Sequence, residues 1–479
     1  MKNFTFLLFS LLFYAWGAPV FVFILTFSTL VNFYIVKLIY HRSKRQERRL
    51  LAGLSVTINL GLLIYFKYSN FFVENINEVF GLIGWNHIQW TRVVLPIGIS
   101  FFTFQSLTYT IDVYRRIHTP LKSPLDYLLY IIMFPQLIAG PIVRFETIAD
   151  QLSERHETNN DRLTGFYRFI IGLAKKVLIA DVLGAEVNRV MELDFATLDS
   201  TTAWIGILAY TFQIYFDFSG YSDMAIGIGR MVGFRFPENF NNPYTAKSIT
   251  EFWRRWHMTF TTFMRLYLYY PLGGNRVNTK GRLYFNLMLV FIVSGFWHGA
   301  SWNFLLWGLI HGFFLIIERL FLLKLIDRIG KFFGWFYTFL VAVLAWVPFR
   351  IEGLTNSMTY YKKLFAFDFV RFNTINNTEL YLVLILAFII SIITLTKSGL
   401  RLEKIIYETN LSNRKHLIYF SFALGIFIIC IATLAGSGFS PFILFQILSM
   451  KSIPKILIWF AGNLIFNTGF TVYFSGDKC

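Results

Sequence analysis

Apolar runs about as long as a membrane-spanning helix recur along the whole chain, and short polar segments separate them. About 20 apolar residues in a helix cross the hydrocarbon layer of a bilayer. The pattern therefore predicts roughly ten to twelve transmembrane helices in an all-α, polytopic membrane protein. The clearest runs cover residues 17–39, 50–66, 92–111, 126–142, 203–224, 283–298, 301–322, 333–349, 378–396 and 416–435, with a further candidate at 453–468.

Polar residues and glycines inside these runs concentrate in the middle of the chain. Residues 1–90 and 333–479 read as plain spans, whereas residues 92–318 hold most of the unusual positions. Two segments there, "FPQLIAGPIVRFE" (134–146) and "RLYLYYPLGGNR" (265–276), contain proline and glycine that break a helix. Broken backbone at membrane depth is tolerated beside protein or a water-filled cavity, so both segments indicate a cavity wall, with an interfacial turn as the alternative for the second. We expect a single membrane domain whose middle zone, residues 92–318, carries any chemistry.

Composition supports a membrane protein and explains the charge. Hydrophobic residues make up 56% of the chain, charged residues only 15%, and mean hydropathy is +0.54. The net charge of +17 fits cytoplasmic loops and anionic headgroups better than nucleic acid. The cluster "HRSKRQERR" (41–49) predicts a cytoplasmic loop, the segment 70–90 without Lys or Arg an external loop, and "VYRRIHTPLK" (113–122) a second cytoplasmic loop.

Several function classes are excluded or left without support. The two cysteines, Cys430 and Cys479, provide neither a disulfide framework nor metal-binding spacing, so no metal and no bound cofactor are expected. No P-loop, dinucleotide-binding glycine pattern or nucleophile elbow is present, which argues against an ATP-driven pump. The N-terminus resembles a signal peptide, but another apolar run follows at once. We therefore expect an uncleaved segment that is too short to cross the membrane fully.

The stretch "SGFWHGASW" (294–302) places an imidazole at the end of an apolar run. Gly295 and Gly299 are four residues apart, so on a helix they share a face and let another backbone approach His298. Ionisable groups at such positions are costly and tend to be functional. A neutral imidazole is suited to general base chemistry, while a hydrogen bond between packed helices is an equally good explanation from this stretch alone.

His311 repeats the arrangement, with Gly308 and Gly312 on either side. It lies thirteen residues after His298, so the two imidazoles would not share a face of one straight helix unless the chain breaks near Ser301. For His311 a packing role with a hydrogen bond is the favoured interpretation.

The segment "EFWRRWHMTFTTFMRLYLYY" (251–270) has aromatic residues at three-and-four spacing, which predicts an amphipathic helix. Arg254, Arg255 and Arg265 lie on its other face. They indicate either an interfacial anchor or a site for the phosphates of a carrier or nucleotide. His257 is the exception, because it lies on the aromatic face.

Asp217 and Asp223 interrupt the apolar run "YTFQIYFDFSGYSDMAIGIGR" (210–230). Carboxylates inside a span should face the protein interior and find partners, and the three arginines named above are the obvious ones. The pair is explained either by buried salt bridges or by the polar wall of a reaction chamber or ion path.

Two classes of function fit these constellations. In a membrane enzyme, a histidine would deprotonate a hydroxyl as it attacks an activated acyl group in a confined chamber. In a proton-coupled secondary transporter, the aspartates and histidines would form a relay. The absence of a duplicated set of broken helices weighs against transport.

Long strings resemble one family. Residues 217–244, 249–276 and 294–312, with "LPIGISFFTFQSLTYTIDVYR" (95–115) and 134–144, are similar in order to the membrane-bound O-acyltransferase family. The similarity is strongest to its alginate O-acetyltransferase branch and the peptidoglycan-acetylating relatives of that branch.

The resemblance implies helices around a central funnel or tunnel, with His298 as the catalytic residue and His257 as a second important residue on the path. Arg254, Arg255, Arg265, Asp217, Trp297 and Asn275 are the candidate substrate-binding residues. The family implies an acyl donor, with acetyl-CoA as the candidate, and transfer across the plasma (inner) membrane. It also implies an extracytoplasmic SGNH-type acetyltransferase partner and a polysaccharide acceptor. D-alanyl transfer to teichoic acid from a carrier-protein thioester is the alternative within the family.

The chain departs from the family in two places. Leu266 stands where relatives commonly have Asp, which puts the placement of Arg265 in doubt. Relatives often end soon after a string like "FILFQ" (442–446), whereas 33 residues follow it here.

Overall fold

A computed structural model describes residues 2–369, 378–437 and 442, and within them the chain forms helices and no strands. The candidate span at 453–468 and the tail after residue 446 lie outside the described residues. The first helices are α1 (Lys2–Gly17), α2 (Phe21–His41), α3 (Arg45–Leu82), α4 (Ile99–Tyr114), α5 (Pro124–Ile132), α6 (Phe134–Leu137), α7 (Phe145–Ser153), α8 (Asn159–Ala174), α9 (Asp181–Met191) and α10 (Ser200–Met231). Then come α11 (Ile249–Arg255), α12 (Met258–Met264), α13 (Lys280–His298), α14 (Trp302–Ile317), α15 (Leu323–Ile329), α16 (Lys331–Arg350), α17 (Leu354–Leu364), α18 (Thr378–Ile392), α19 (Lys397–Ile406) and α20 (Asn413–Ser437). Short π-helical or 3-10 segments adjoin them at η1 (Lys175–Ala180), η2 (Pro243–Thr245), η3 (Arg265–Tyr269), η4 (Glu318–Leu322) and η6 (Ile393–Leu395).

Five helices in the described residues combine the length and apolar composition of a membrane span. They are α2, α3, α16, α18 extended to Leu395, and α20 as far as Gly436. Other apolar runs form helices that are shorter, more polar or interrupted, so the predicted count of ten to twelve spans and the funnel are not confirmed. The apolar helices and the family matched below identify a membrane protein.

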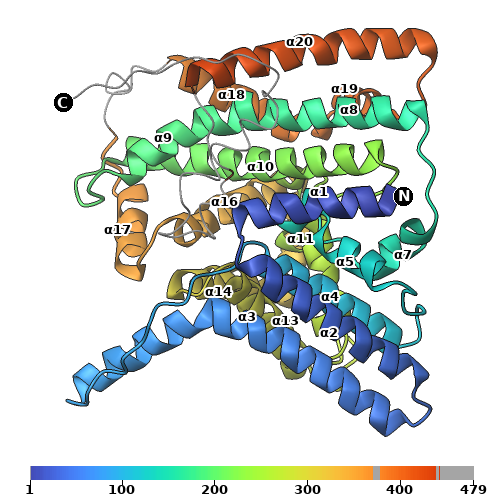
Figure 1. Cartoon of the computed structure of the whole chain (residues 1–479). Helices are drawn as coiled ribbons and strands as arrows, with labels where there is room; N and C mark the ends of the chain where they lie inside the picture. Colours follow the sequence, from blue (N-terminus) through green and yellow to red (C-terminus); the bar gives the residue numbers. More distant parts are fainter. Residues whose placement is uncertain (1, 370–377, 438–441, 443–479) are drawn as a thin grey trace, which may run out of the picture.

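Two predicted segments differ from the structure. The run 126–142 is not one span, because the helix stops at Ile132 and the chain then passes through the four-residue α6 into extended backbone. Pro135 and the Gly140–Pro141 pair account for this, since Gly140 adopts φ +92°. The predicted external loop at 70–90 is helical as far as Leu82, because residues 70–80 contain neither proline nor glycine. In Figure 1 this end of α3 reaches out beyond the other helices.

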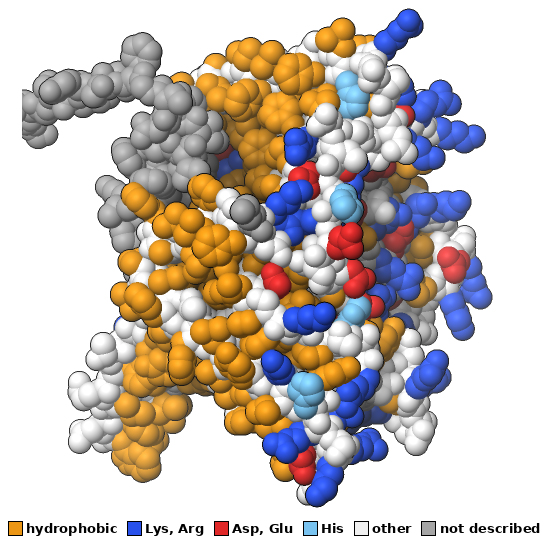
Figure 2. Space-filling view, turned by 45° about the vertical axis from the view of Figure 1, so that its right-hand side comes forward, with side chains coloured by type: hydrophobic (Ala, Val, Ile, Leu, Met, Phe, Trp, Pro, Cys, Tyr) orange, Lys and Arg blue, Asp and Glu red, His pale blue; other side chains and the backbone are white. Residues whose placement is uncertain are grey.

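One face of the molecule separates charge from hydrophobic surface. Figure 2 shows Lys and Arg gathered along one edge and hydrophobic side chains across much of the rest. The start of α1 meets the segment before α8 in the Lys2–Glu157 ion pair, with 2.7 Å between Nζ and Oε1. Near α2, Arg48 donates to the carbonyl of Tyr114, which joins the two basic segments predicted to be cytoplasmic. The distribution fits a cytoplasmic edge rich in basic residues.

Helices α8, α10 and α20 lie side by side (Figure 1), and glycines set the closest approach of the first two. Gly165 faces Gly227, and Gly172 faces Gly220, seven residues apart on each antiparallel helix. A Cβ added at Gly165 would lie 2.6 Å from the Gly227 carbonyl oxygen, and one at Gly227 would lie 2.5 Å from the Gly165 carbonyl oxygen. The obstacles are backbone atoms, which cannot move aside as a side chain can.

Substituting Gly227 with leucine is therefore expected to lower the free energy of unfolding by about 3 kcal/mol, since overpacking forces two backbones apart. Thermal unfolding of the purified protein in detergent measures this. Gly53→Leu in α3 is the matched control, because a Cβ there meets nothing within 4 Å and leucine is the better helix former. Equal unfolding midpoints for the two variants would contradict the packing explanation.

Candidate active site

His257 lies at a break between two short helices rather than on one continuous amphipathic helix. Helix α11 ends at Arg255, α12 begins at Met258, and His257 itself adopts the left-handed conformation with φ 42° and ψ 53°. Two backbone hydrogen bonds to a neighbouring segment replace helical ones: Met258 N–H donates to the Asn239 carbonyl, and Asn241 N–H donates to the Arg255 carbonyl. A non-glycine residue in this conformation stores strain on the order of 1 kcal/mol, which marks the break as a constrained feature.

A hydrogen-bond chain fixes the His257 imidazole. The Ile142 N–H donates to Thr259 Oγ1 over 2.9 Å, so the Thr259 hydroxyl is free to donate to Asn239 Oδ1 over 2.8 Å. The Asn239 amide nitrogen donates to Ser222 Oγ over 3.0 Å, which is consistent with the same amide orientation. Because Oδ1 accepts only, His257 Nδ1, 2.9 Å away, carries the proton. The lone pair is therefore on Nε2, which is available to accept a proton.

His298 is the last residue of α13, and its imidazole packs among aromatic side chains. Its imidazole packs against Trp297, Trp307, Phe349 and Phe260, with centroids 4.8 to 5.6 Å away. Unlike His257 it is only partly buried, and it makes no hydrogen bond or ion pair within the part of the chain that the structure describes. Its nitrogens are therefore free for a substrate.

The two histidines flank the same aromatic pair. The Phe260 ring lies 5.1 Å from the His257 ring and 5.6 Å from the His298 ring. The Trp297 ring lies 6.3 Å from His257 and 4.8 Å from His298. Residues 41 positions apart in sequence thus meet at one apolar wall.

The glycine seam predicted beside His298 is present at Gly295, whereas Gly299 lies past the end of α13 in extended backbone and does not share its helix face. A Cβ at Gly295 would overlap the Phe304 carbonyl of α14, and one at Gly308 would overlap the Phe291 carbonyl of α13. The chain also breaks between Gly299 and Ser301, as the orientation of the two histidines required. Helices α13 and α14 therefore pack closely just before the partly buried imidazole.

His311 and Glu318 hold helix α11. Trp253 donates its indole N–H to His311 Nδ1 over 3.3 Å, which is the hydrogen bond expected for a packing role. Glu318 Oε2 accepts from the Thr250 N–H and hydroxyl at 2.9 and 2.7 Å, at the start of α11. Both contacts fix the helix that leads into His257.

Asp217 and Asp223 are buried as expected, but the predicted partners are wrong. Asp217 pairs with Lys176 of η1 at 2.7 Å. Asp223 pairs with Arg168 of α8 at 2.6 Å and with Lys175 at 2.7 Å. Because α8 and η1 pack along α10, their basic side chains lie next to the two carboxylates, where they form these ion pairs.

Among the described residues, none of the three predicted arginines reaches either aspartate. Arg255 instead pairs with Glu251 at 2.8 Å, while Arg254 and Arg265 are exposed. Asn275 accepts from Tyr269 and Arg319. The carbonyl of the adjacent Gly274 accepts from Asn286 of α13, which lies about 18 Å from His298 along the 1.5 Å rise of that helix. Only Trp297 of the predicted substrate-binding residues touches the histidine pair, and a binding role for the others stays a prediction.

Lys67 of α3 is the residue that sequence reasoning missed. Its amine donates to the carbonyl oxygen of Trp297 and to Ser100 Oγ, the latter at 3.1 Å, and it lies 5.4 Å from the Trp297 ring centroid. It is buried, yet it has no carboxylate partner among the described residues. The available signal was a lysine directly after the apolar run 50–66, and nothing in the sequence pointed from it to His298.

Two further observations bear on the chemistry. The Trp297 indole N–H is buried and has no hydrogen-bond acceptor in the described part of the chain. No group of three His, Cys, Asp or Glu suited to a metal ion occurs in the same residues. The groups present are proton acceptors and hydrogen-bond donors, which fits proton transfer and stabilisation of an oxyanion.

Comparison with known proteins agrees with this chemistry. The sequence profile of the membrane-bound O-acyltransferase family matches residues 11–360. The probable alginate O-acetylase AlgI of Pseudomonas aeruginosa is 41% identical over 403 residues, covering 84% of this chain and 76% of that protein. The peptidoglycan O-acetyltransferase of Helicobacter pylori is 39% identical over 391 residues, covering 74% and 72%. The teichoic acid D-alanyltransferase of Bacillus subtilis is 29% identical over 231 residues, covering 45% and 56%.

Proposed function

This chain belongs to the membrane-bound O-acyltransferase family, and from that premise we propose that it moves acetyl groups from a cytoplasmic donor across the membrane for O-acetylation of an exopolysaccharide or cell-wall polymer. The observation that carries the proposal is the pair His257 and His298 on one aromatic wall. It occurs in a chain whose high-identity relatives are O-acetylases of alginate and peptidoglycan. The D-alanyltransferase relative is similar over a much smaller part of the chain, which favours acetyl over D-alanyl transfer.

His298 is proposed as the general base. Its free nitrogen accepts the hydroxyl proton of the acceptor while the hydroxyl oxygen attacks the carbonyl carbon of an acetyl thioester. The new carbon–oxygen bond forms, the carbon–sulfur bond breaks, and the departing thiolate takes the proton from the imidazolium. His257, fixed by Asn239, presents Nε2 to the same wall and assists the proton transfer.

Lys67 is proposed to stabilise the negative charge that develops on the carbonyl oxygen. A lysine amine offers up to three N–H donors, and here two serve Trp297 and Ser100. A third donor beside His298 fits the requirement for a preorganised donor in a site that excludes water. The unpaired indole N–H of Trp297 is a second candidate donor.

The remaining assignments follow from the family. We propose acetyl-CoA as the donor, the plasma membrane as the location, and an extracytoplasmic SGNH-type partner that completes transfer to the polymer. The named relatives act on alginate and peptidoglycan, which makes an exopolysaccharide or cell-wall polymer the acceptor class.

The ester formed identifies the reaction. In cells that carry the chain, mild alkali is expected to release acetate from the purified polysaccharide, and deletion of the coding sequence should remove that acetate. Chromatography distinguishes acetate from D-alanine. Release of D-alanine from teichoic acid would support the alternative donor, and no change in either ester on deletion would contradict the proposed function.

A further inference from the structure

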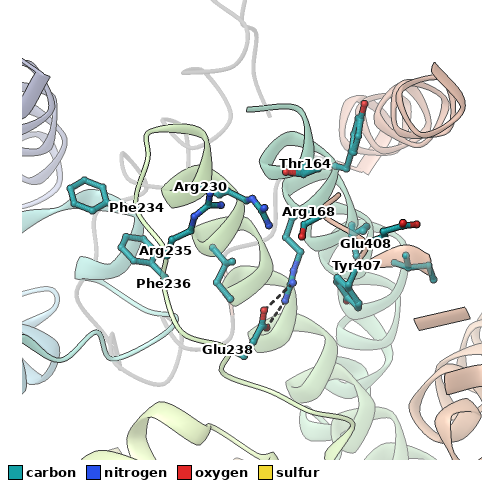
Figure 3. Close-up of a pocket in the computed structure, with 14 residues that line it drawn as sticks. Thr164, Arg168, Arg230, Phe234, Arg235, Phe236, Glu238, Tyr407 and Glu408 are labelled. Atoms are coloured by element: carbon teal, nitrogen blue, oxygen red, sulfur yellow. Dashed lines mark hydrogen bonds and ion pairs between the residues drawn. The ribbon is translucent and has the colours of Figure 1, made fainter. Parts of the chain in front are cut away.

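A cavity of about 200 Å³ opens beside the ends of α8 and α10, and we call it the arginine cavity. Arg168 of α8, Arg230 of α10 and Arg235 of the following segment line it (Figure 3). Aromatic rings complete the wall, contributed by Tyr167, Phe234, Phe236 and Tyr407. Arg230, Phe234, Arg235 and Phe236 lie in the string 217–244, but none of the seven residues was a candidate site residue in the sequence analysis.

The arginines in this cavity are unequally neutralised. Arg168 pairs with both Asp223 and Glu238, each at 2.6 Å, as Figure 3 shows for Glu238. A single carboxylate, Asp161, serves both Arg235 at 2.5 Å and Arg230 at 3.4 Å. Two guanidiniums therefore share one negative charge.

Arg230 is the group left with spare binding capacity. Its Nε is buried and has no hydrogen-bond partner in the described residues, and its contact with Asp161 is long. Burial and then the charge of Arg235 lower the pKa of Arg230, so an added anion would stabilise its charged form. Burial opposes ionisation of Asp161, but hydrogen bonds from Arg235 and Thr158 outweigh it and lower its pKa to about 2. The Asp161 carboxylate is therefore ionised at neutral pH, and Arg230 and Arg235 share its negative charge.

We propose that the arginine cavity binds the phosphate of an organic ligand at the cytoplasmic edge, with Arg230 as the principal contact and the aromatic rings packing on the organic part. Guanidinium groups recognise phosphate by paired hydrogen bonds, and Arg230 and Arg235 have only the carboxylate of Asp161 between them in the described residues. The ligand we propose is the phosphate end of the acyl donor, so this proposal rests on the proposed function.

The cavity is joined to the histidines through one short segment. Glu238 lines the cavity on Arg168, and the next residue, Asn239, fixes the His257 imidazole. Two neighbouring residues of α10 make a second connection: Asp223 accepts a hydrogen bond from Arg168, and Ser222 accepts one from Asn239. A phosphate that displaced Glu238 from Arg168 would change the contacts of Glu238. Glu238 directly precedes Asn239, which binds the His257 imidazole.

The test measures binding of adenosine 3′,5′-bisphosphate to the purified full-length protein. This probe carries the 3′-phosphate and one of the two 5′-phosphates of coenzyme A, without the pantetheine arm and its acyl group. The bisphosphate is expected to raise the unfolding midpoint of the wild type, with an effect that weakens at high salt. Arg230→Gln should bind about tenfold more weakly, the loss expected for one charge-assisted contact. Glu238→Gln, which removes a competing carboxylate at an exposed position, should bind more tightly. Arg282→Gln, an exposed arginine of α13 outside the cavity, is the matched control.

A second arm separates a soluble donor from a lipid headgroup as the source of the phosphate. Three results together would overturn the donor assignment in favour of a lipid. The protein would be more stable in nanodiscs containing phosphatidylglycerol than in phosphatidylcholine nanodiscs, Arg230→Gln would lose this difference, and the bisphosphate would have no effect. No binding of either probe, or equal binding by wild type and Arg230→Gln, would overturn the site itself. These readouts do not depend on turnover. Acetyl ester in cells with no phosphate bound would leave the proposed function intact, whereas bound phosphate without acetyl ester would contradict the function alone.

Discussion

Replacing His298 with alanine is expected to abolish detectable acetyl ester on the polysaccharide. A positioned general base contributes on the order of a hundred- to ten-thousandfold. The neighbouring histidines, His257 and His311, are each separated from His298 by an aromatic ring, Phe260 and Trp307, so neither replaces it directly. Acetate released by alkali from the polymer, normalised to the amount of the variant in the membrane, measures the effect. His298→Gln tests the same point with a smaller loss of ring packing.

The control must separate chemistry from folding, because the His298 ring contacts four aromatic side chains. His156→Ala removes a histidine whose side chain is 85% exposed and which, among the described residues, pairs with Glu154 at 3.3 Å, so wild-type ester is expected. If His298→Ala retains wild-type ester at matched protein level, His298 is not the base, and the acceptor proton must leave by another route.

The sequence motifs located the candidate site more successfully than they described its surroundings. His298 and His257 stood out because an imidazole is unusual in an apolar run, and the seam at Gly295 followed from helical spacing. The break at His257 could not be seen, since no glycine or proline interrupts the segment and the apolar period continues through it. It depends on backbone hydrogen bonds from residues 239–241, which only the folded chain supplies.

The partners of the buried aspartates show the same limit. The sequence motifs suggested the arginines of 254–265 as partners of the two aspartates. The ion pairs are instead formed by Arg168, Lys175 and Lys176, about fifty residues before the aspartates. What places them there is the close glycine packing of α8 on α10. Charge complementarity alone does not identify a partner when several basic segments compete, and helix packing decides the outcome.

Lys67→Met is expected to lower the rate of acetyl transfer about a hundredfold while leaving the protein folded. Removing one preorganised donor from an oxyanion site typically reduces turnover by two to three orders of magnitude. Stability should change little, because the lost hydrogen bonds to Trp297 and Ser100 are offset by removing an amine that has no carboxylate partner among the described residues. A donor used only in the transition state lowers kcat and leaves KM for the acetyl donor nearly unchanged.

The pattern of variants distinguishes this role from a structural one. Lys67→Arg keeps a cationic donor at the same place and should recover part of the rate, whereas a lysine that merely joined α3 to α13 would affect the unfolding midpoint more than kcat. Lys122→Met, at an exposed position before α5, is the matched control and should behave as the wild type. Acetyl transfer by purified protein from radiolabelled acetyl-CoA, measured beside thermal unfolding, provides both readouts. A fall in the unfolding midpoint with kcat unchanged would assign Lys67 to helix packing, and the oxyanion would then depend on the Trp297 indole N–H alone.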